Sequence, residues 1–302
     1  MAERAVLIAC FSGTGNTARV AELLRRAFAA RGCLVRLEAI DHGLHAVEAA
    51  AGADLVGIGH PVHAWGAPRI IFDFLRRLPP GGGRPAFLFR TAGDPLLNGG
   101  ATARVRRALA RRGYDLLRDD LFIMPANVAI AYDPRLIKQL DLAAQRLAPR
   151  LAEEVLAGER HLPREGWGRQ IASALFSRGE SAGARLWGHG LSATAACTGC
   201  GRCARECPAG NIALREGRPV FGWDCLMCLR CLYGCPAGAL RPVVGRRFLL
   251  DGYDIAPAVA DADLPADFLS PASPGMYRRF YAHLRATGAL PGEPAEEGPR
   301  EL

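Results

Sequence analysis

Two cysteine runs of the same design lie in the C-terminal half of this 302-residue chain. They hold eight of its ten cysteines, and every cysteine of the second run follows its counterpart by 28 positions. The runs read Cys197-x2-Cys200-x2-Cys203-x3-Cys207-Pro208 and Cys225-x2-Cys228-x2-Cys231-x3-Cys235-Pro236. The repetition continues through Pro-Ala-Gly at 208–210 and 236–238, so it predicts two copies of one small structural unit.

The spacing within each run indicates an iron–sulfur centre. Cysteines at i, i+3 and i+6 surround one cube with a short loop, whereas the fourth cysteine, followed by proline, reaches the other cube. We therefore expect one 4Fe–4S cluster on Cys197, Cys200, Cys203 and Cys235. We expect the second cluster on Cys225, Cys228, Cys231 and Cys207. With this motif, residues 194–242 resemble the bacterial-type two-cluster ferredoxins.

Zinc and disulfides are the alternative uses of these cysteines. Structural zinc prefers paired C-x2-C or C-x2-C with H-x3-H ligands, which leaves no place for a third cysteine at i+6. Disulfides need an oxidising compartment, but the acidic N-terminus leads directly into a strand-like run and does not resemble a signal peptide. No apolar run approaches the roughly 18 residues that cross a bilayer. We therefore expect a soluble cytoplasmic protein with reduced thiols.

The first half of the chain alternates between strand and helix patterns. Its strands are short and continuously apolar, as in a parallel sheet that is buried on both faces. We expect strands at 6–10, 33–39, 54–59, 86–90 and 121–124, and helices at 16–31, 68–78, 100–112 and 134–157. This alternation predicts a doubly wound α/β fold with a five-stranded parallel sheet, which binds ligands at the C-terminal ends of its strands.

A glycine-containing polar loop follows the first strand. Its two glycines let the backbone approach a ligand closely, its side chains offer neutral donors, and the next helix adds the positive end of its dipole. The loop consists of Ser12, Gly13, Thr14, Gly15, Asn16 and Thr17. It suits a phosphate monoester. It lacks the Gly-Lys-Ser/Thr of a metal–nucleotide loop and the G-x-G-x-x-G of a dinucleotide site.

Cys10 precedes this loop, where a cysteine phosphatase carries its nucleophile. Such an enzyme also needs an arginine six residues later, and position 16 is asparagine. We therefore interpret Cys10 and Cys33 as small buried apolar side chains.

The phosphate loop and its position make residues 3–158 resemble flavodoxin. The resemblance implies FMN, with its phosphate on residues 12–17 and its ring between two further loops. The loop after the third strand contributes Pro61, Val62, His63, Ala64, Trp65 and Gly66. The loop after the fourth strand contributes Thr91, Ala92, Gly93 and Asp94, and it runs on to Asn98-Gly99-Gly100.

Within these loops, Trp65 is the candidate that stacks on the flavin ring. Its alternative role is to pack beneath the cluster domain. His60 and His63 are candidates to contact the N1–C2 edge of the flavin ring or a partner protein. The alternative is that each is a solvated or structural residue. Gly93 and Asp94 are expected to present backbone amides to the ring. The second loop lacks the aromatic that many flavodoxins place over the other flavin face, so that face is open to a partner or to the cluster domain.

The rest of the chain divides into three parts. Residues 159–193 form a connector with a helix at 168–178, and residues 194–245 form a small α+β ferredoxin domain. Residues 246–302 form a tail with one amphipathic helix at Met276–Leu284 and disorder from Gly288. The first domain then covers residues 1–158.

Charge gives a weaker signal than the motifs. The formal net charge is +8, but two clusters and a flavin phosphate bring the loaded protein to about +2. A nucleic-acid partner is therefore not indicated. One helix carries most of the clustered charge and is either a solvated face or a docking patch for an acidic partner; its arginines are Arg104, Arg106, Arg107, Arg111 and Arg112.

The order of the two modules resembles flavodoxin–ferredoxin fusion proteins. That resemblance implies an electron-transfer protein that passes electrons between two 4Fe–4S clusters and FMN and on to a partner reductase. We find no motif for bond-making chemistry. The alternatives are a flavin-dependent reductase that acts on a small molecule with the clusters as electron input, and a sensor of oxygen or iron.

Overall fold

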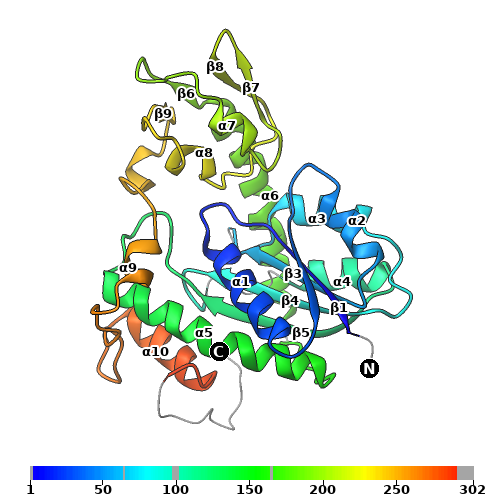
Figure 1. Cartoon of the computed structure of the whole chain (residues 1–302). Coiled ribbons are helices and arrows are strands. Elements are labelled where there is room, and N and C mark those ends of the chain that lie inside the picture. The colour runs from blue at the N-terminus through cyan, green and yellow to red at the C-terminus, as the bar shows by residue number, and fades with distance from the viewer. Residues whose placement is uncertain (1–2, 64, 97–101, 164–165, 291–302) are drawn as a thin grey trace.

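The computed structural model describes residues 3–63, 65–96, 102–163 and 166–290. Figure 1 shows an α/β domain, a small domain above it, and a C-terminal segment that returns to the α/β domain. A long helix, α6, passes from the α/β domain to the small domain.

The α/β domain is built on one parallel sheet. Its strands are β1 (Ala5–Cys10), β2 (Leu34–Ala39), β3 (Leu55–Pro61), β4 (Pro85–Ala92) and β5 (Asp115–Ile123). They lie in the order β2-β1-β3-β4-β5, and all four pairings are parallel. The strand order reverses at β1, so ligands are expected beside the C-terminal ends of β1 and β3.

Helices cover both faces of this sheet. They are α1 (Asn16–Ala29), α2 (His45–Ala51), α3 (Arg69–Arg77), α4 (Ala103–Arg111) and α5 (Pro134–Leu156). The core on one face joins α1 and α5 to the sheet, and the core on the other face joins α2, α3 and α4 to it. Because both faces are covered, the inner strands β1, β3 and β4 are largely apolar. The predicted five-stranded doubly wound fold is confirmed.

Within the α/β domain, the observed elements differ from the sequence pattern mainly in two places. The sequence pattern does not predict helix α2, because His45–Ala51 is only seven residues long and consists mostly of alanine, so it shows no clear apolar period. Strand β5 begins at Asp115, six residues before the expected start at Leu121. Its first half contains three consecutive charged residues, Arg118, Asp119 and Asp120, which hide the apolar pattern of a buried strand.

Ion pairs allow these charges to lie in the sheet. Asp119 accepts a hydrogen bond of 2.8 Å from Arg90 of β4, and the two side chains are 0% and 3% exposed. Arg106 of α4 lies 3.8 Å from the other carboxylate oxygen. Arg118 is paired with Asp120 and Glu154. The charges are therefore compensated within the fold rather than by solvent.

We expect Asp119→Asn to lower the free energy of unfolding by about 3–5 kcal/mol, because it removes the carboxylate from a buried site that faces two arginines. Urea unfolding measures the change. Asp115→Asn is the matched control, since the Asp115–Arg160 pair is solvent-exposed and such pairs contribute at most about 1 kcal/mol. Equal losses in the two variants would contradict the role given to Asp119.

Helix α6 (Trp167–His189) extends well beyond the connector helix expected at 168–178. Its N-terminal half contacts the loop after β3, where Ser173 Oγ donates to the carbonyl of Trp65. Its C-terminal end reaches the small domain, where His189 stacks on Trp223 with ring centroids 3.9 Å apart. One rigid element thus connects the two domains.

The small domain contains two short antiparallel ladders and two single-turn helices. Its elements are β6 (Ser192–Ala193), α7 (Arg202–Arg205), β7 (Ile212–Arg215), β8 (Arg218–Phe221), α8 (Arg230–Tyr233) and β9 (Leu240–Arg241). Strand β6 pairs with β9, and β7 pairs with β8. The core is small and includes several of the repeated cysteines, so little apolar burial holds this domain together.

The C-terminal segment packs against α5. It contains η1 (Arg246–Phe248), α9 (Ala256–Ala260) and α10 (Met276–Ala286), the last of which lies where the sequence indicates an amphipathic helix. Phe280 and Leu284 of α10 are buried in one cluster with Leu136 and Leu140 of α5. The described part of the segment is thus bound to the α/β domain. Disorder was expected from Gly288, but Ala289 and Leu290 are buried in the same cluster; residues 291–302 lie outside the described residues.

Among the described residues, no helix is both long enough and apolar enough to cross a membrane.

Candidate functional sites

The structure groups the eight repeated cysteines into two hollows of the small domain. One hollow is lined by Cys197, Cys200, Cys203 and Cys235. The other is lined by Cys207, Cys225, Cys228 and Cys231. The last cysteine of each run therefore lies with the first three of the other run. We call these hollows the first and the second cysteine hollow.

The two runs share one backbone conformation. Gly199 and Gly201 have positive φ, and so do Met227 and Leu229, which stand 28 positions later. Left-handed φ at Met227 and Leu229 costs about 1–2 kcal/mol per residue, so the surrounding loop must impose it. The same turn folds the chain around each hollow.

Backbone N–H groups point at the sulfurs. The amide of Asn211 donates to Cys207 Sγ, and the amide of Ala239 donates to Cys235 Sγ, both at 3.3 Å. The amide of Met227 donates to Cys225 Sγ at 3.3 Å. Such bonds favour the thiolate, the form that binds metal.

Burial acts in the opposite direction. It raises the pKa of Cys228 to about 11 and the pKa of Cys231 further still. The exposed Cys200 differs, because the backbone N–H of Arg202 lowers the pKa of its thiol. Buried thiols of this kind ionise when a cation compensates their charge. Four sulfur donors per hollow fit a 4Fe–4S cluster. Within the described ranges, no three His, Cys, Asp or Glu side chains converge as ligands of a single metal ion.

The candidate phosphate loop lies between β1 and α1, at the C-terminal edge of the sheet. Gly15 adopts φ +105° and caps α1, and its amide donates to Ser12 Oγ at 3.2 Å. Thr14 Oγ1 accepts from Asn127 at 2.9 Å. Thr17 Oγ1 lies 2.8 Å from Thr91 Oγ1, near the C-terminal end of β4. The loop is thus fixed at the N-terminus of a 14-residue helix, which favours an anion.

Cys10 ends β1 beside this loop and is 6% exposed. Burial raises its pKa to about 12, so the thiol stays neutral, as expected of a small apolar side chain.

The loop after β3 forms a tight turn. His63 and Gly66 exchange backbone hydrogen bonds, and Trp65 adopts φ +63°. The Trp65 ring packs on Phe176 of α6 with centroids 4.4 Å apart. The structure therefore places Trp65 against the connector helix. Pro61 and Val62 lead into the turn, and Val62 donates to the carbonyl of Thr91. Ala64 lies outside the described residues.

The loop after β4 is held by residues that come later in the chain. Arg279 of α10 donates to Asp94 at 2.6 Å, and Tyr132 donates to the carbonyl of Gly93 at 2.6 Å. A Cβ at Gly93 would lie 2.9 Å from Ala126 Cβ, so this position is closely packed. Ala92 ends β4, and Asn98-Gly99-Gly100 lie outside the described residues.

Comparison with known proteins covers both parts of the chain. Residues 191–236 match the 4Fe-4S dicluster domain family. The order β2-β1-β3-β4-β5 is the flavodoxin-like order. The chain joins a domain of flavodoxin-like fold to a segment that matches the 4Fe-4S dicluster domain family, called here the dicluster domain.

Solved structures with flavodoxin-like folds align with about half of the chain. One is a flavodoxin from the domain Archaea, at 14% identity over 50% of this chain and 99% of that one, with a TM-score of 0.38. Another is flavodoxin 2 from Bacillus cereus, at 20% identity over 52% and 99%, with a TM-score of 0.40. A third is the flavodiiron protein from Giardia intestinalis, at 18% identity over 51% and 36%, with a TM-score of 0.39. No curated protein matches the chain by sequence.

The dicluster domain sits directly on the candidate phosphate loop of the flavodoxin-like domain. A Cβ built on Gly13 would lie 2.3 Å from the carbonyl oxygen of Cys228, so only glycine allows this approach. Arg230 of α8 donates to the carbonyls of Ser12 and Gly13. The second cysteine hollow is therefore next to the candidate phosphate site.

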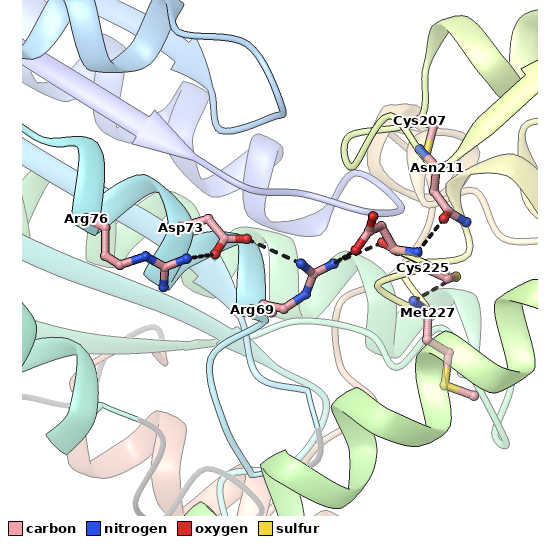
Figure 2. Close-up of polar contacts among 8 residues, drawn as sticks. Arg69, Asp73, Arg76, Cys207, Asn211, Cys225 and Met227 are labelled. Carbon is pink, nitrogen blue, oxygen red and sulfur yellow. Dashed lines mark hydrogen bonds and ion pairs between the residues drawn. The ribbon is translucent and has the colours of Figure 1, made fainter. Parts of the chain in front are cut away.

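A second set of contacts joins α3 to the same hollow. Figure 2 shows a row of polar contacts from Arg76 through Asp73 and Arg69 toward Asn211 and Cys207. Arg69 donates to the side chain and the carbonyl of Asp224 at 3.2 Å. The amide of Asp224 in turn donates to Asn211 Oδ1. The row thus connects a helix of the flavodoxin-like domain to a residue that bonds a cysteine sulfur.

His60 and His63 lie between these parts. His60 is fully buried at the end of β3, with Nδ1 at 3.0 Å from the carbonyl of Pro61. His63 bonds the backbone of Leu226, between Cys225 and Cys228, and it packs edge-on against Phe11. Burial lowers the pKa of each to about 4. Both rings are therefore neutral near pH 7.

The buried His60 predicts a loss of stability in acid. Its pKa falls from 6.5 in the unfolded chain to about 4 in the fold, so the unfolded state binds the proton more tightly. The stabilisation is complete above pH 6.5 and is lost as the pH falls toward 4, by about 3 kcal/mol. Urea unfolding measures the free energy of unfolding across this pH range. It should fall less steeply with decreasing pH in His60→Gln than in the wild type, whereas His42→Gln, a change at an exposed site, should follow the wild type. Parallel curves for all three proteins would contradict this role.

The basic helix α4 is largely engaged within the fold. Arg104 lies 4.7 Å from the centroid of the Phe72 ring, Arg106 donates to the carbonyl of Pro163, and Arg112 donates to the carbonyl of Leu78. Arg107 and Arg111 remain exposed. The helix thus exposes two arginines to solvent rather than a continuous patch.

Several residues at these sites carry no sequence signal. Arg230, Arg279, Gly188 and Tyr253 lie far along the chain from the loops that they contact. Tyr253 Oη lies 2.7 Å from Asn16 Oδ1 and 2.9 Å from the carbonyl of Pro125. Only the folding of the dicluster domain and the C-terminal segment onto the flavodoxin-like domain brings them there.

Proposed function

We propose that this chain is an electron-transfer protein that holds two 4Fe–4S clusters and FMN and exchanges electrons with a partner reductase. The observation that carries the proposal is the contact between Cys228 and Gly13, which joins a cluster loop to the phosphate loop. When bound, the clusters supply one-electron transfer and FMN supplies one- or two-electron transfer.

The chain's own residues hold the groups and exclude water. The first hollow would take one cluster on Cys197, Cys200, Cys203 and Cys235, and the second would take the other on Cys207, Cys225, Cys228 and Cys231. The amides at 12–17 and the N-terminus of α1 would bind the FMN phosphate. The loops at 61–66 and 91–94 would flank the ring. We propose four parts of the chain: the FMN-binding domain at 1–158, the connector at 159–193, the cluster-binding domain at 194–245 and the C-terminal tail at 246–302.

The two hollows differ in their surroundings. The second hollow lies against the phosphate loop, whereas the first includes the exposed Cys200. We therefore assign the second hollow to the inner site, which faces FMN. Fixing both groups in one chain gives each a high effective concentration at the other.

The test is to quantify iron, sulfide and flavin in one anaerobically purified sample. We expect about eight irons and one FMN per chain. Cys200→Ala should leave about half of the iron, because it removes a ligand of the first hollow only. Cys33→Ala is the control and should retain all of it. Full iron in Cys200→Ala would contradict the ligand assignment, and full iron without flavin would contradict the FMN site.

A further inference from the structure

We propose that residues 243–248, together with Leu186 of α6, form the docking surface for an acidic electron-carrier protein. This inference rests on the proposed function, since it assigns the place where the partner binds. The surface, called here the 243–248 patch, lies between β9 and α9, where the chain passes from the dicluster domain to the C-terminal segment (Figure 1).

Large apolar side chains are exposed on this patch. Val243 is 77% exposed, Val244 64%, Phe248 66% and Leu186 67%. Trp187 and Phe248 both lie close to Gly245, since an ideal Cβ there would be 3.6 Å from Trp187 Nε1 and 4.0 Å from Phe248 Cδ2. Exposed apolar side chains that gather in one place mark interaction sites more often than scattered ones do.

The patch lies directly over a cluster site. Trp187 donates to the carbonyl of Val244 at 3.0 Å, and the same tryptophan lines the second cysteine hollow with Cys207 and Cys225. One aromatic side chain therefore separates a bound partner from that hollow. The flavin side is reached from the same hollow through Cys228. A docked carrier would thus lie next to the inner cluster site without displacing any part of the fold.

Charge selects the partner. Arg246 and Arg247 are exposed within the patch, and among the described residues neither belongs to an ion pair. An apolar centre with unpaired cations fits a protein whose own surface combines apolar and acidic groups. A second copy of this chain fits poorly, since a two-fold contact would bring like charges together. A lipid surface would have no need of a cluster beneath it.

The experiment measures binding rather than turnover. The probes are an acidic 2Fe–2S ferredoxin and an acidic flavodoxin, titrated calorimetrically into the chain whose iron content has been verified. We expect Arg246→Glu with Arg247→Glu to weaken binding at least about tenfold, and Phe248→Ser by a similar factor. Wild-type affinity should fall steeply between about 0.05 and 0.3 M ionic strength. Arg107→Glu with Arg111→Glu is the matched control and should bind as the wild type does.

Several outcomes would overturn the proposal. One is that the patch variants bind the probes with unchanged affinity. Another is that the control variant loses as much affinity as the patch variants do. A third is that neither probe binds the wild type at low salt. Binding of the wild type to anionic vesicles that the patch variants lose would assign the patch to a lipid surface instead. A wild-type dimer that the patch variants convert to monomer would assign it to self-association. Because iron is measured on the same samples, a missing cluster is distinguished from a missing partner site.

Discussion

Gly188→Ala is expected to remove about half of the iron from the holoprotein. Gly188 lies near the end of α6, and a Cβ there would be 2.0 Å from Cys225 Cβ and 2.4 Å from its sulfur. Cβ atoms do not approach other atoms so closely, so Cys225 must leave its place in the second hollow. The first hollow does not contact this position and should keep its cluster. Iron and sulfide analysis of the purified variant measures the loss.

The same helix offers a matched control. Apart from its chain neighbours and the backbone of its own helix, Gly183 has nothing within 4 Å of its ideal Cβ, so Gly183→Ala should retain all of its iron. Both substitutions favour the helix by up to about 1 kcal/mol. A loss confined to Gly188→Ala therefore reports the contact with Cys225 rather than a change in helix stability. Full iron in Gly188→Ala would show that Cys225 can bind its cluster from another position.

Arg230→Ala is expected to weaken FMN binding by about tenfold, although Arg230 belongs to the dicluster domain. Its guanidinium donates to the carbonyls of Ser12 and Gly13. Hydrogen bonds from a charged donor contribute about 1.5–3 kcal/mol, and 1.4 kcal/mol corresponds to tenfold in affinity. The arginine also places positive charge beside the loop proposed for the phosphate. Titration of the flavin-free protein with FMN, followed by quenching of flavin fluorescence, measures the effect.

Two further variants define the cause. Arg205→Ala removes an arginine of the same domain that donates to the carbonyl of Cys200, away from the phosphate loop, and it should bind FMN normally. Gly13→Ala disturbs the same contact from the other side, because its Cβ would meet the carbonyl of Cys228. It should weaken FMN binding as Arg230→Ala does. If Arg230→Ala binds FMN normally, the two domains do not share the phosphate site.

The sheet and the cysteine groups illustrate what local sequence patterns carry. Continuous apolar runs indicate β1, β3 and β4 because these strands are buried on both faces. Strand β5 was recognised only in its second half, since Arg118, Asp119 and Asp120 look like surface residues until their partners are known. The spacing of the cysteines predicts the same two groups that line the two hollows, because the geometry of a cluster limits how its ligands are spaced along the chain.

The loops around the proposed flavin site illustrate the opposite case. The phosphate loop is recognised from Gly13, Gly15 and its position after a strand, since a close backbone approach needs glycine there. The side chain proposed to stack on the ring, Trp65, lies against Phe176 of α6. That contact depends on the length and direction of a helix a hundred residues away. No local pattern reports it.

By itself, the sequence determined the doubly wound fold and the two cysteine groups, and it located the glycine-containing loop after β1 for which we propose phosphate binding. Each of these follows from side chains within one segment or from a repeat at a constant interval. Only the tertiary structure decided that the second hollow, rather than the first, lies on the phosphate loop. It also decided that Arg230 contacts the loop after β1, that Arg279 contacts the loop after β4, and that Gly188 lies against Cys225. These contacts join residues that are far apart along the chain. Packing between two such surfaces produces no regular period of apolar residues and no fixed motif spacing, so the sequence does not reveal it.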